Sequence, residues 1–438
     1  MTRPDVTKPG VPAGLTARLR DILQLRFTPL FRTFPAAVLA TISPANPWKR
    51  LARVLAYAGL RLVGHLFRPI RNPDELHGKL WLYVVSPNNY DSLHFIKQAR
   101  PDAVLVAGQG KQIGRYNAAV NRLSLRRKLL YYWQYPAAMR GLLRLEGAKA
   151  RRFFDLIFYA IGYYEVYRRA LRHYRPRAVV FANDHNDDTR SLLLACRAEG
   201  VPTAYVQHAS VSTHFPPLGF DLNLLEGQDA LDKYRLCGPV HGRVALVGMP
   251  KADEFLSRRN EAPAVRRVGI TTNLHDPLPA LLDTLTYLLA ELPALHFTLR
   301  PHPVDTRDYG PLRQALPALE WSDARQEKVF DFLARQDALI AADTSTHLEA
   351  TLLNLASLYH RLGTNAMTDD YYGYVARGLV DRADTLPELT ARLRRYQQHK
   401  PLDLYLRAAS YNATLGTADE GRSQALCLRV LDEWLRTP

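Results

Sequence analysis

Residues that can hold a phosphate or move a proton follow several short apolar runs in this sequence. Arg300-Pro301-His302-Pro303 follows the run 295–299, where two prolines end the strand. Asp343-Thr344-Ser345-Thr346 follows the run 338–341, and a helical pattern containing Glu349 begins there. Because arginine, histidine and the free N–H groups of a helix start bind phosphate, the two strand ends together predict a nucleotide-phosphate site. Glu349 would bond a ribose there or balance the helix dipole.

A plainer interpretation of each motif stays open. The first motif alone is compatible with an ordinary strand-to-loop turn, and the hydroxyls of the second can simply cap a helix. Thr271-Thr272-Asn273 follows a further run and adds hydroxyl and amide donors, although Thr and Asn are also common turn residues. We assign the donor side of a site to Thr271, Thr272, Asn273, Arg300, Asp343, Thr344, Ser345, Thr346 and Glu349, with His302 beside them as a catalytic residue.

The first half of the chain contains the groups suited to acid–base chemistry. Asn183-Asp184-His185 follows the apolar run 178–182, and Gln207-His208-Ala209-Ser210 ends the run 203–207. A histidine titrates at about pH 6.5, so His208 can serve as a general base toward an acceptor hydroxyl. Asp184 is the alternative base, or it orients His208. We place His185, Gln207 and Ser210 on the acceptor side, while a histidine that merely hydrogen-bonds a loop remains the other interpretation.

The elements that position these residues form two series. In each, short apolar runs alternate with helical patterns, which predicts parallel sheets built from strand–helix–strand units. The runs are 80–85, 103–107, 178–182, 203–207, 220–225 and 244–247 in the first series, and 268–271, 296–299, 338–341 and 356–359 in the second. Ligands of such sheets bind at the carboxyl ends of the strands, where the motifs stand. The predicted fold class is α/β, with two Rossmann-like domains facing a central cleft.

Changes in composition divide the chain. We predict a basic helical N-terminal extension at 1–75, an acceptor domain at 76–258, a nucleotide-donor domain at 264–400, and helices at 401–438 that pack back across the domain junction. A polar stretch, 256–266, is the linker. The segment 114–174 is predicted to be helical, and its cluster Tyr131-Tyr132-Trp133 is assigned to the core.

The charge of the chain favours an anionic partner. Its 438 residues include 58 Lys and Arg against 42 Asp and Glu, a formal net charge of +16. Residues 1–72 hold twelve of these bases and two acids, and apolar residues recur at helical spacing from Pro47 to Phe67, with Trp48 on the flank. This pattern predicts contact with an anionic membrane, and a helix packed on the protein is the alternative. No run of five bases and no zinc-finger spacing occurs, so we expect no nucleic-acid partner.

Missing patterns exclude several classes of protein. The sequence has no GxGxxG and no P-loop lysine motif, which argues against a dehydrogenase or an NTPase. It has no HxxxH or CxxC pair, so we expect no metal and no other cofactor. Three scattered cysteines, Cys196, Cys237 and Cys427, are expected to be small buried hydrophobes in a reducing compartment. Without a signal-peptide pattern or an apolar stretch of about 18 residues, a cytoplasmic protein is expected, peripheral on the inner face of the membrane.

In their order, the motifs resemble those of the bacterial surface- and capsule-polysaccharide transferases of GT-B type. That broad group holds the teichoic-acid glycerophosphotransferases, the polysialyltransferases and the Kdo transferases. The resemblance covers roughly residues 80 to 400 and rests on Asn183-Asp184-His185, Gln207-His208-Ala209-Ser210, Arg300-Pro301-His302-Pro303, and Asp343-Thr344-Ser345 with Glu349. It implies that His302, Thr344 and Ser345 contact the phosphate of a nucleotide-activated donor. It also implies that His208 or Asp184 faces the acceptor.

The sequence departs from the motifs of two of these subgroups. The polymerising glycerophosphotransferases carry His-Gly where this chain has His208-Ala209. The two acids followed by glycine of the sialyltransferases are absent, and Asp187-Asp188-Thr189 is the nearest approach. The base of the donor therefore stays open among CMP, CDP, UDP and GDP.

Residues and resemblance together predict a metal-independent glycosyltransferase. It would move a sugar from a nucleotide-activated donor to a surface polysaccharide or a lipid-linked glycan. Arg300, His302 and the helix start at 344–346 would stabilise the charge on the leaving phosphate in place of a metal. The alternatives are a CDP-polyol-dependent glycerol- or ribitol-phosphate transferase, a sugar-nucleotide 2-epimerase, which shares the fold, and a non-catalytic glycan-binding protein.

Overall fold

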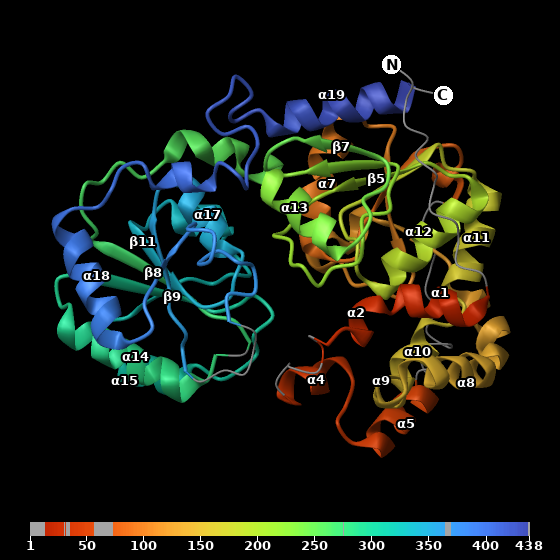
Figure 1. The fold of residues 1–438 in the computed structure, drawn as a ribbon, viewed down its shortest axis with the longest axis horizontal. Helices are drawn as coiled ribbons and strands as arrows, with labels where there is room; N and C mark the ends of the chain where they lie inside the picture. Colours follow the sequence, from red (N-terminus) through yellow and green to blue (C-terminus); the bar gives the residue numbers. More distant parts are fainter. Residues whose placement is uncertain are drawn as a thin grey trace.

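Two parallel β-sheets form the cores of two lobes (Figure 1). The computed structural model describes residues 14–29, 31, 36–56, 73–274, 276–363 and 369–436. The first lobe has a seven-stranded sheet in the order β3-β2-β1-β4-β5-β6-β7, and the second has a six-stranded sheet in the order β10-β9-β8-β11-β12-β13. This arrangement confirms the α/β class with two Rossmann-like domains.

The first sheet is covered by helices on both faces, so its central strands are apolar at nearly every position. Its strands are β1 (Leu80–Tyr83), β2 (Val104–Gly108), β3 (Asn121–Leu123), β4 (Ala178–Phe181), β5 (Thr203–Val206), β6 (Leu222–Leu225) and β7 (Arg243–Leu246). The helices include α7 (Pro87–Ala99), α11 (Tyr163–Tyr174), α12 (Asp187–Glu199) and α13 (Gln228–Cys237). The strand order reverses between β1 and β4, the point where α/β sheets bind ligands.

The second sheet repeats this plan and reverses between β8 and β11. Its strands are β8 (Arg267–Thr271), β9 (His296–Arg300), β10 (Glu320–Trp321), β11 (Ala338–Ala341), β12 (Ala356–Tyr359) and β13 (Asp381–Arg382). Its helices are α14 (Leu278–Glu291), α15 (Gly310–Ala315), α16 (Val329–Leu333), α17 (Thr346–Leu352) and α18 (Leu386–Gln398). The edge strands β10 and β13 are two residues long, too short to leave an apolar run that sequence patterns reveal.

A helical layer packs beside the first sheet. It contains α1 (Leu15–Ile22), α2 (Gln24–Phe27), α4 (Ala36–Ile42), α5 (Pro47–Ala56), η2 (Pro73–Leu76), η4 (Arg126–Gln134), α8 (Tyr135–Glu146), α9 (Ala148–Arg152) and α10 (Phe154–Ala160). The short helix η3 (Gly114–Ala119) packs against α7 instead. The helix expected from Pro47 is present as far as Ala56, and the rest of that prediction lies outside the described residues.

Two predictions for the segment 114–174 are wrong in part. It is not wholly helical, because β3 lies within it and pairs with β2. The core assignment holds only partly for the cluster at 131–133: Tyr131 and Tyr132 pack against the core, whereas Trp133 is 75% exposed. Trp133 lies on a 3-10 helix that leaves its ring in solvent, and neighbouring aromatic residues in the sequence gave no sign of this.

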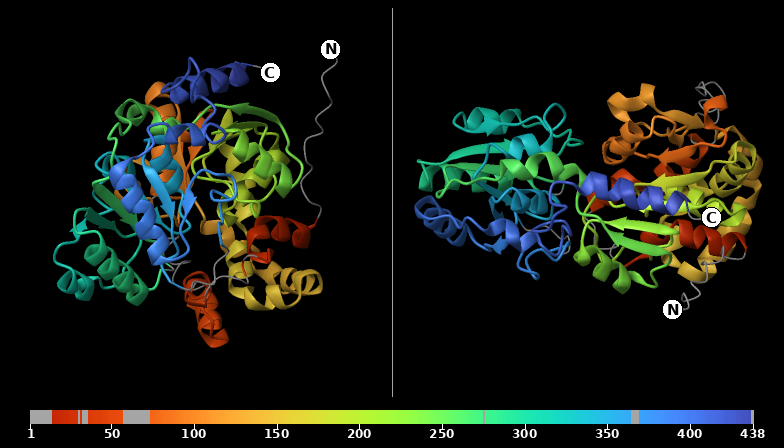
Figure 2. Two further views of the ribbon diagram at one scale, coloured as in Figure 1. Left: turned by 60° about the vertical axis from the view of Figure 1, so that its left-hand side comes forward. Right: turned by 90° about the horizontal axis from the view of Figure 1, so that it is seen from above.

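The C-terminal segment returns from the second lobe to the first (Figure 2). After η5 (Pro250–Arg258) and the second sheet, η6 (Leu404–Ala408) packs on α17, and α19 (Ser423–Arg436) packs on η5 and α7. Helix α19 places Cys427 and Leu431 in the core beneath the first sheet. Cys196 is likewise buried and Cys237 is half-buried. In the described part of the chain, no helix has both the length and the apolar character needed to cross a membrane.

Candidate active site

The carboxyl ends of the two sheets meet where the lobes touch. The segment after β12 reaches the first lobe through several contacts. Among them, Tyr374 contacts Ser210 after β5, the Tyr372 carbonyl accepts from Lys233 Nζ at 2.6 Å, and Arg377 Nη1 pairs with Asp229 Oδ1 at 2.7 Å. The strand-end motifs of both lobes therefore lie on the sides of the lobes that face each other.

Asp184 and His185 form a pair after β4. The Asn183 side chain accepts from the backbone N–H groups of His185 (3.2 Å) and Asn186 (2.9 Å), a turn that sets the start of α12. Asp184 Oδ1 lies 2.8 Å from His185 Nδ1, and its Oδ2 accepts from Tyr234 at 2.7 Å. Burial works to raise the pKa of Asp184, but these partners outweigh burial and lower it. Asp184 is thus an ionised carboxylate that orients His185.

His208 carries an unsatisfied nitrogen beside that pair. Its Nδ1 is buried and has no hydrogen-bond partner among the described residues. Burial lowers the pKa of His208 to about 3; His185 and Lys251 act in the same direction and Asp184 opposes them. The imidazole is therefore neutral near pH 7. An orphaned buried nitrogen costs about 1–3 kcal/mol unless a ligand or water meets it, which marks this position as a contact point.

Lys251 and Glu226 belong to the same junction, and the sequence motifs did not single them out. Lys251 Nζ pairs with Glu349 Oε1 at 2.5 Å. Burial disfavours its charge, yet Glu349 and Glu226 raise the pKa of Lys251. Burial raises the pKa of Glu226 to about 7, with Lys251 opposing. Both residues follow strands of the first sheet. Their position after a strand end is the feature by which the sequence could have identified them.

The predicted acceptor-side residues Gln207 and Ser210 are both engaged. Gln207 Nε2 donates to the Ala209 carbonyl (3.0 Å) and to Glu226 Oε2 (3.2 Å), and its Oε1 accepts from the Glu226 N–H at 2.9 Å. The Ser210 hydroxyl contacts Tyr374. Gln207 therefore fixes the strand end from which His208 projects, and Ser210 ties it to the second lobe.

Arg300 and His302 point in different directions from the end of β9. The Arg300 guanidinium is buried, donates to Ser322 Oγ (2.6 Å) and the Glu327 carbonyl (2.7 Å), and lies over Phe332. These contacts occupy the guanidinium inside the second lobe, so Arg300 supports the fold of that lobe and is not available to a phosphate. His302 is exposed, and its Nδ1 accepts from the Val304 N–H at 3.3 Å.

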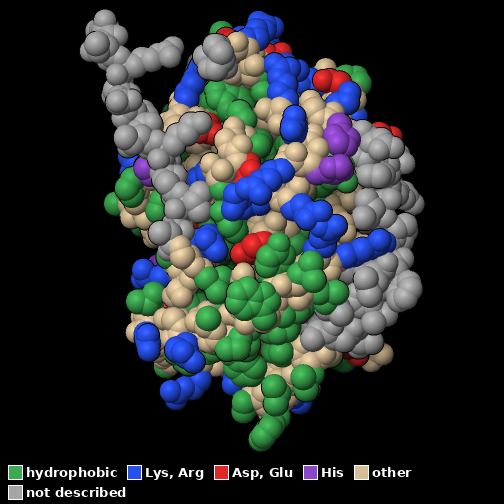
Figure 3. Space-filling model, turned by 90° about the vertical axis from the view of Figure 1, so that its right-hand side faces the viewer, with side chains coloured by type: hydrophobic (Ala, Val, Ile, Leu, Met, Phe, Trp, Pro, Cys, Tyr) green, Lys and Arg blue, Asp and Glu red, His purple; other side chains and the backbone are tan. Residues whose placement is uncertain are grey.

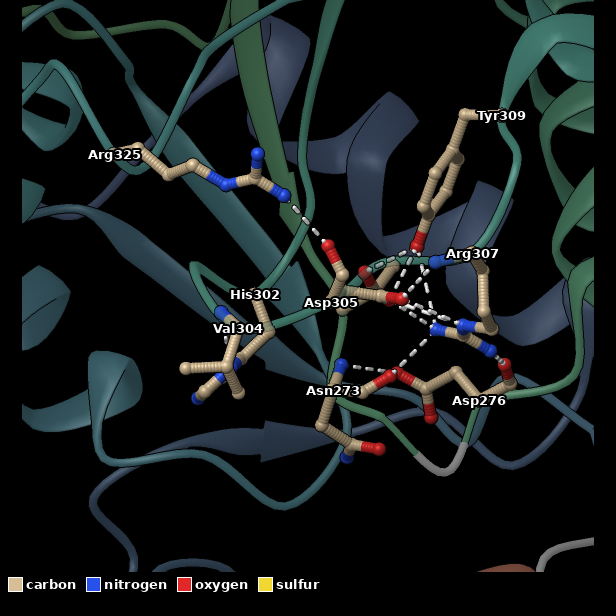
Figure 4. Close-up of polar contacts among 9 residues, drawn as sticks. Asn273, Asp276, His302, Val304, Asp305, Arg307, Tyr309 and Arg325 are labelled. Carbon is tan, nitrogen blue, oxygen red and sulfur yellow. Dashed lines mark hydrogen bonds and ion pairs between the residues drawn. The ribbon is translucent and has the colours of Figure 1, made fainter. Parts of the chain in front are cut away.

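A brace fixes the turn that carries His302 (Figure 4). Arg307 bonds the carboxylate of Asp305 and the carbonyl of Asn273 (3.0 Å), so it joins the loops after β9 and β8. Arg325 Nη2 donates to the Asp305 carbonyl at 2.9 Å. His302 lies on the other side of Asp305 from Arg307 (Figure 4), and its Nε2 makes no hydrogen bond within the described part of the chain.

The strand-order reversal between β8 and β11 contains a small recess. It is lined by Asn273, Asp276, Ala342, Asp343, Arg361, Leu362 and Gly363, and its free volume of about 10 Å³ suits about one water. Burial raises the pKa of Asp276 to about 7 and that of Asp343 to about 6. Asp343 Oδ1 accepts from the Tyr371 N–H at 2.7 Å, so Asp343 anchors the segment that reaches the first lobe.

The predicted hydroxyl donors occupy the rest of this edge. Thr271 Oγ1 is buried and has no hydrogen-bond partner among the residues that the structure describes, and Thr272 Oγ1 lies 3.4 Å from the Tyr309 hydroxyl. Thr344 and Thr346 hydroxyls are 3.0 Å apart, and Thr344 Oγ1 accepts from the Thr346 N–H at the start of α17. Ser345 stands at the N-cap but makes no capping bond through its side chain. Among the described residues, no three His, Cys, Asp or Glu are grouped to hold a metal.

Comparison with known proteins identifies the architecture. No family model and no curated protein matches the sequence. The S. aureus MnaA–UDP structure aligns with a TM-score of 0.50 and 11% identity, over 82% of this chain and 98% of that one. The UDP-GlcNAc 2-epimerase of Neisseria meningitidis bound to UDP-GlcNAc gives 0.50 and 11%, over 81% and 100%. This chain has the GT-B fold.

The wall teichoic acid polymerase TagF also aligns, with a TM-score of 0.49 and 10% identity, over 89% of this chain and 97% of that one. The identities of all these structures are low enough that the comparison establishes the fold and leaves activity to the residues of the site.

Proposed function

We propose that the protein is a metal-independent glycosyltransferase that moves a sugar from a nucleotide-activated donor to a glycan or lipid-linked acceptor. The observation that carries the proposal is the unpartnered Nδ1 of His208. It lies at the meeting of the lobes, close enough to the Asp184–His185 pair and to Lys251 for them to change its pKa. A general base in that place faces both the acceptor side and the donor side.

In the proposed reaction, His208 accepts the proton of the acceptor hydroxyl. Being neutral, the imidazole has a lone pair for this proton. Burial makes His208 a weaker base than the free imidazole assumed from the sequence, and the nearby Asp184 carboxylate opposes that effect by favouring the imidazolium that forms. The freed oxygen bonds the anomeric carbon of the sugar, and the bond from that carbon to the donor phosphate breaks. Asp184 acts as a positioning residue, because its oxygens are already bonded to His185 and Tyr234.

The electron pair of the broken bond goes to the leaving nucleotide, and nearby donors stabilise the charge. Lys251 is a cation of this junction, and Glu349 holds it in place. His302 Nε2 and the hydroxyls of Thr271 and Thr344 complete the proposed donor side. Donors fixed in advance where charge develops are the effective form of such catalysis and can replace a metal.

A sugar-nucleotide 2-epimerase is the second candidate, and two observations favour it. The UDP-GlcNAc 2-epimerase of Neisseria meningitidis aligns with this chain. In addition, Glu226 has a pKa of about 7 at the junction, which suits a carboxyl that gives and takes protons without an acceptor.

Product analysis separates the candidates. The full chain is first screened for thermal stabilisation by CMP, CDP, UDP and GDP, since a ligand of the native state raises its stability. Donors carrying the best nucleotide are then incubated with glycan acceptors, with and without EDTA, and analysed by mass spectrometry. A sugar added to the acceptor, unaffected by EDTA, is expected. A phosphopolyol increment, or a donor epimerised without acceptor, would replace the proposal by the corresponding alternative.

The variant His208→Asn distinguishes binding from chemistry. It should retain nucleotide-induced stabilisation and lose transfer, because the amide cannot accept the proton. Nucleotide binding without consumption of any donor, already in the wild type, would favour a glycan-binding protein instead.

A further inference from the structure

Helix α5 turns its apolar side toward solvent, although a surface helix normally packs that side against the protein. Trp48, Leu51 and Leu55 share one face and are exposed, Trp48 at 74% and Leu55 at 65%. Arg50 is buried instead: its Nη1 donates to the carbonyl of Arg152, and its guanidinium lies 5.2 Å from the centre of the Phe154 ring. A buried arginine beneath an exposed tryptophan reverses the usual partition of side chains, so this face fits a surface that contacts a partner.

A second exposed apolar stretch comes from η4 and α8. Leu130 is 64% exposed, Trp133 75% and Leu145 59%. Helix α8 buries Leu142 in the core, so its exposed leucines are not needed for packing. These residues are about eighty positions away from α5 in the sequence, and no motif connects the two stretches.

Both stretches flank the same helix, α10. Helix α5 packs against α10, Tyr132 of η4 stacks on Phe158 with ring centres 4.5 Å apart, and the Tyr135 hydroxyl donates to the Phe154 carbonyl at 3.2 Å. Figure 3 shows hydrophobic side chains gathered on the lower part of the molecule, at the height of α5 and α8–α10, with Lys and Arg around them. We call this surface the α5–α8 face; its apolar members are Trp48, Leu51, Leu55, Leu130, Trp133 and Leu145.

The charge around the α5–α8 face is almost entirely positive. From residue 126 to 154 eight residues are Lys or Arg and Glu146 is the only acid, while 36–56 contains three bases and no acid. Glu146 is already paired with Arg20 (2.7 Å) and Lys149 (3.4 Å). The exposed bases are Lys49, Arg53, Arg127, Arg140, Arg144 and Arg151, of which Arg53 pairs with the buried Asp155 of α10 at 3.4 Å.

We propose that the α5–α8 face docks on an anionic lipid bilayer. Tryptophan prefers the interface between headgroups and acyl chains, leucines enter the apolar boundary, and surrounding bases pair with lipid phosphates. The proposal extends the membrane contact expected from residues 1–72 to a second segment, 126–154, which the sequence placed in the body of the acceptor domain. It is independent of the proposed catalytic function, because its test needs no substrate.

Vesicle co-sedimentation of the full chain tests the proposal. Vesicles are phosphatidylcholine with or without phosphatidylglycerol. The variant Leu130→Asp/Trp133→Asp should bind anionic vesicles about tenfold or more weakly than the wild type, because it removes apolar contact and adds repulsion. The matched control Leu402→Asp/Leu406→Asp carries the same charge change on two leucines that are each 52% exposed elsewhere, and should bind as the wild type does.

Three outcomes would overturn the proposal. The first is undiminished binding by the 130/133 variant, the second equal loss in the control, and the third equal binding to neutral and anionic vesicles. Light scattering adds a further check: a wild-type dimer that the 130/133 variant converts to a monomer, with vesicle binding unchanged, would make the face an interface between copies. If the aspartate variant melts early, Leu130→Ser/Trp133→Ser replaces it and must show the same loss.

Discussion

At the residue scale, the two polar side chains of the Arg300-Pro301-His302 motif have separable roles. His302→Ala should change the free energy of unfolding by less than about 0.5 kcal/mol, because the side chain is exposed. It should lower transfer about 10²-fold if its ring stabilises the leaving phosphate. Denaturant titration and initial rates measure the two effects.

Arg300→Ala provides the contrast. It leaves Ser322 and the Glu327 carbonyl without their buried donor, and should destabilise the protein by about 1–3 kcal/mol. Near-normal turnover of the His302 variant, or an unfolding free energy of the Arg300 variant equal to that of the wild type, would contradict these assignments.

Glu226 should make stability depend on pH. Its pKa rises from 4.5 to about 7 in the folded protein. Between those values the unfolded chain loses the proton and the folded protein keeps it, so stability falls as pH rises through this window and is constant above it. The loss is on the order of 3 kcal/mol at most.

Glu226→Gln tests this dependence, since the amide cannot ionise. Urea unfolding from pH 4.5 to 8 should show a shallower decline for the variant than for the wild type. Parallel curves would mean that Glu226 titrates normally, and the raised pKa would then have no part in an epimerase mechanism.

At the element scale, α19 is the part of the chain that fastens the second lobe's C-terminal segment to the first lobe. Leu431 is fully buried beneath the first sheet. Leu431→Ala should cost about 2–5 kcal/mol in unfolding free energy, because it removes apolar contact and leaves a cavity. Leu402→Ala, at an exposed position, is the control and should stay within about 0.5 kcal/mol of the wild type.

The elements that sequence patterns found, and those they missed, differ for a physical reason. Buried parallel strands are apolar at nearly every position, so the runs at 178–182 and 338–341 appear as β4 and β11. Strand β3, with the sequence Asn-Arg-Leu, and the two-residue edge strands are too short and too polar to leave such a run. Helix α5 showed its amphipathic period in the sequence, but the period does not state which face turns inward.

At the scale of the whole molecule, Tyr374 joins the two lobes. It is 2% exposed, contacts Ser210 across the junction and lies 5.5 Å, centre to centre, from the ring of Tyr411. Tyr374→Ala should cost about 3–5 kcal/mol and separate the unfolding of the lobes into two steps. Calorimetry measures this, with Tyr374→Phe as the control that keeps the ring and loses only the hydroxyl, at about 1 kcal/mol. A single unchanged transition in the alanine variant would show that the lobes are coupled elsewhere.

The sequence alone determined the α/β class, the two series of strands and the edge on which polar residues gather. These depend on local patterns, because strand burial and strand-end turns are encoded within a few neighbouring residues. The orientation of Arg300, the bond from Tyr234 to Asp184, the place of Lys251 and the outward face of α5 were decided by the tertiary structure. Each of these features depends on a partner far away in the chain. The spacing of residues in the sequence does not show which distant group will pair with a charge or pack against a side chain.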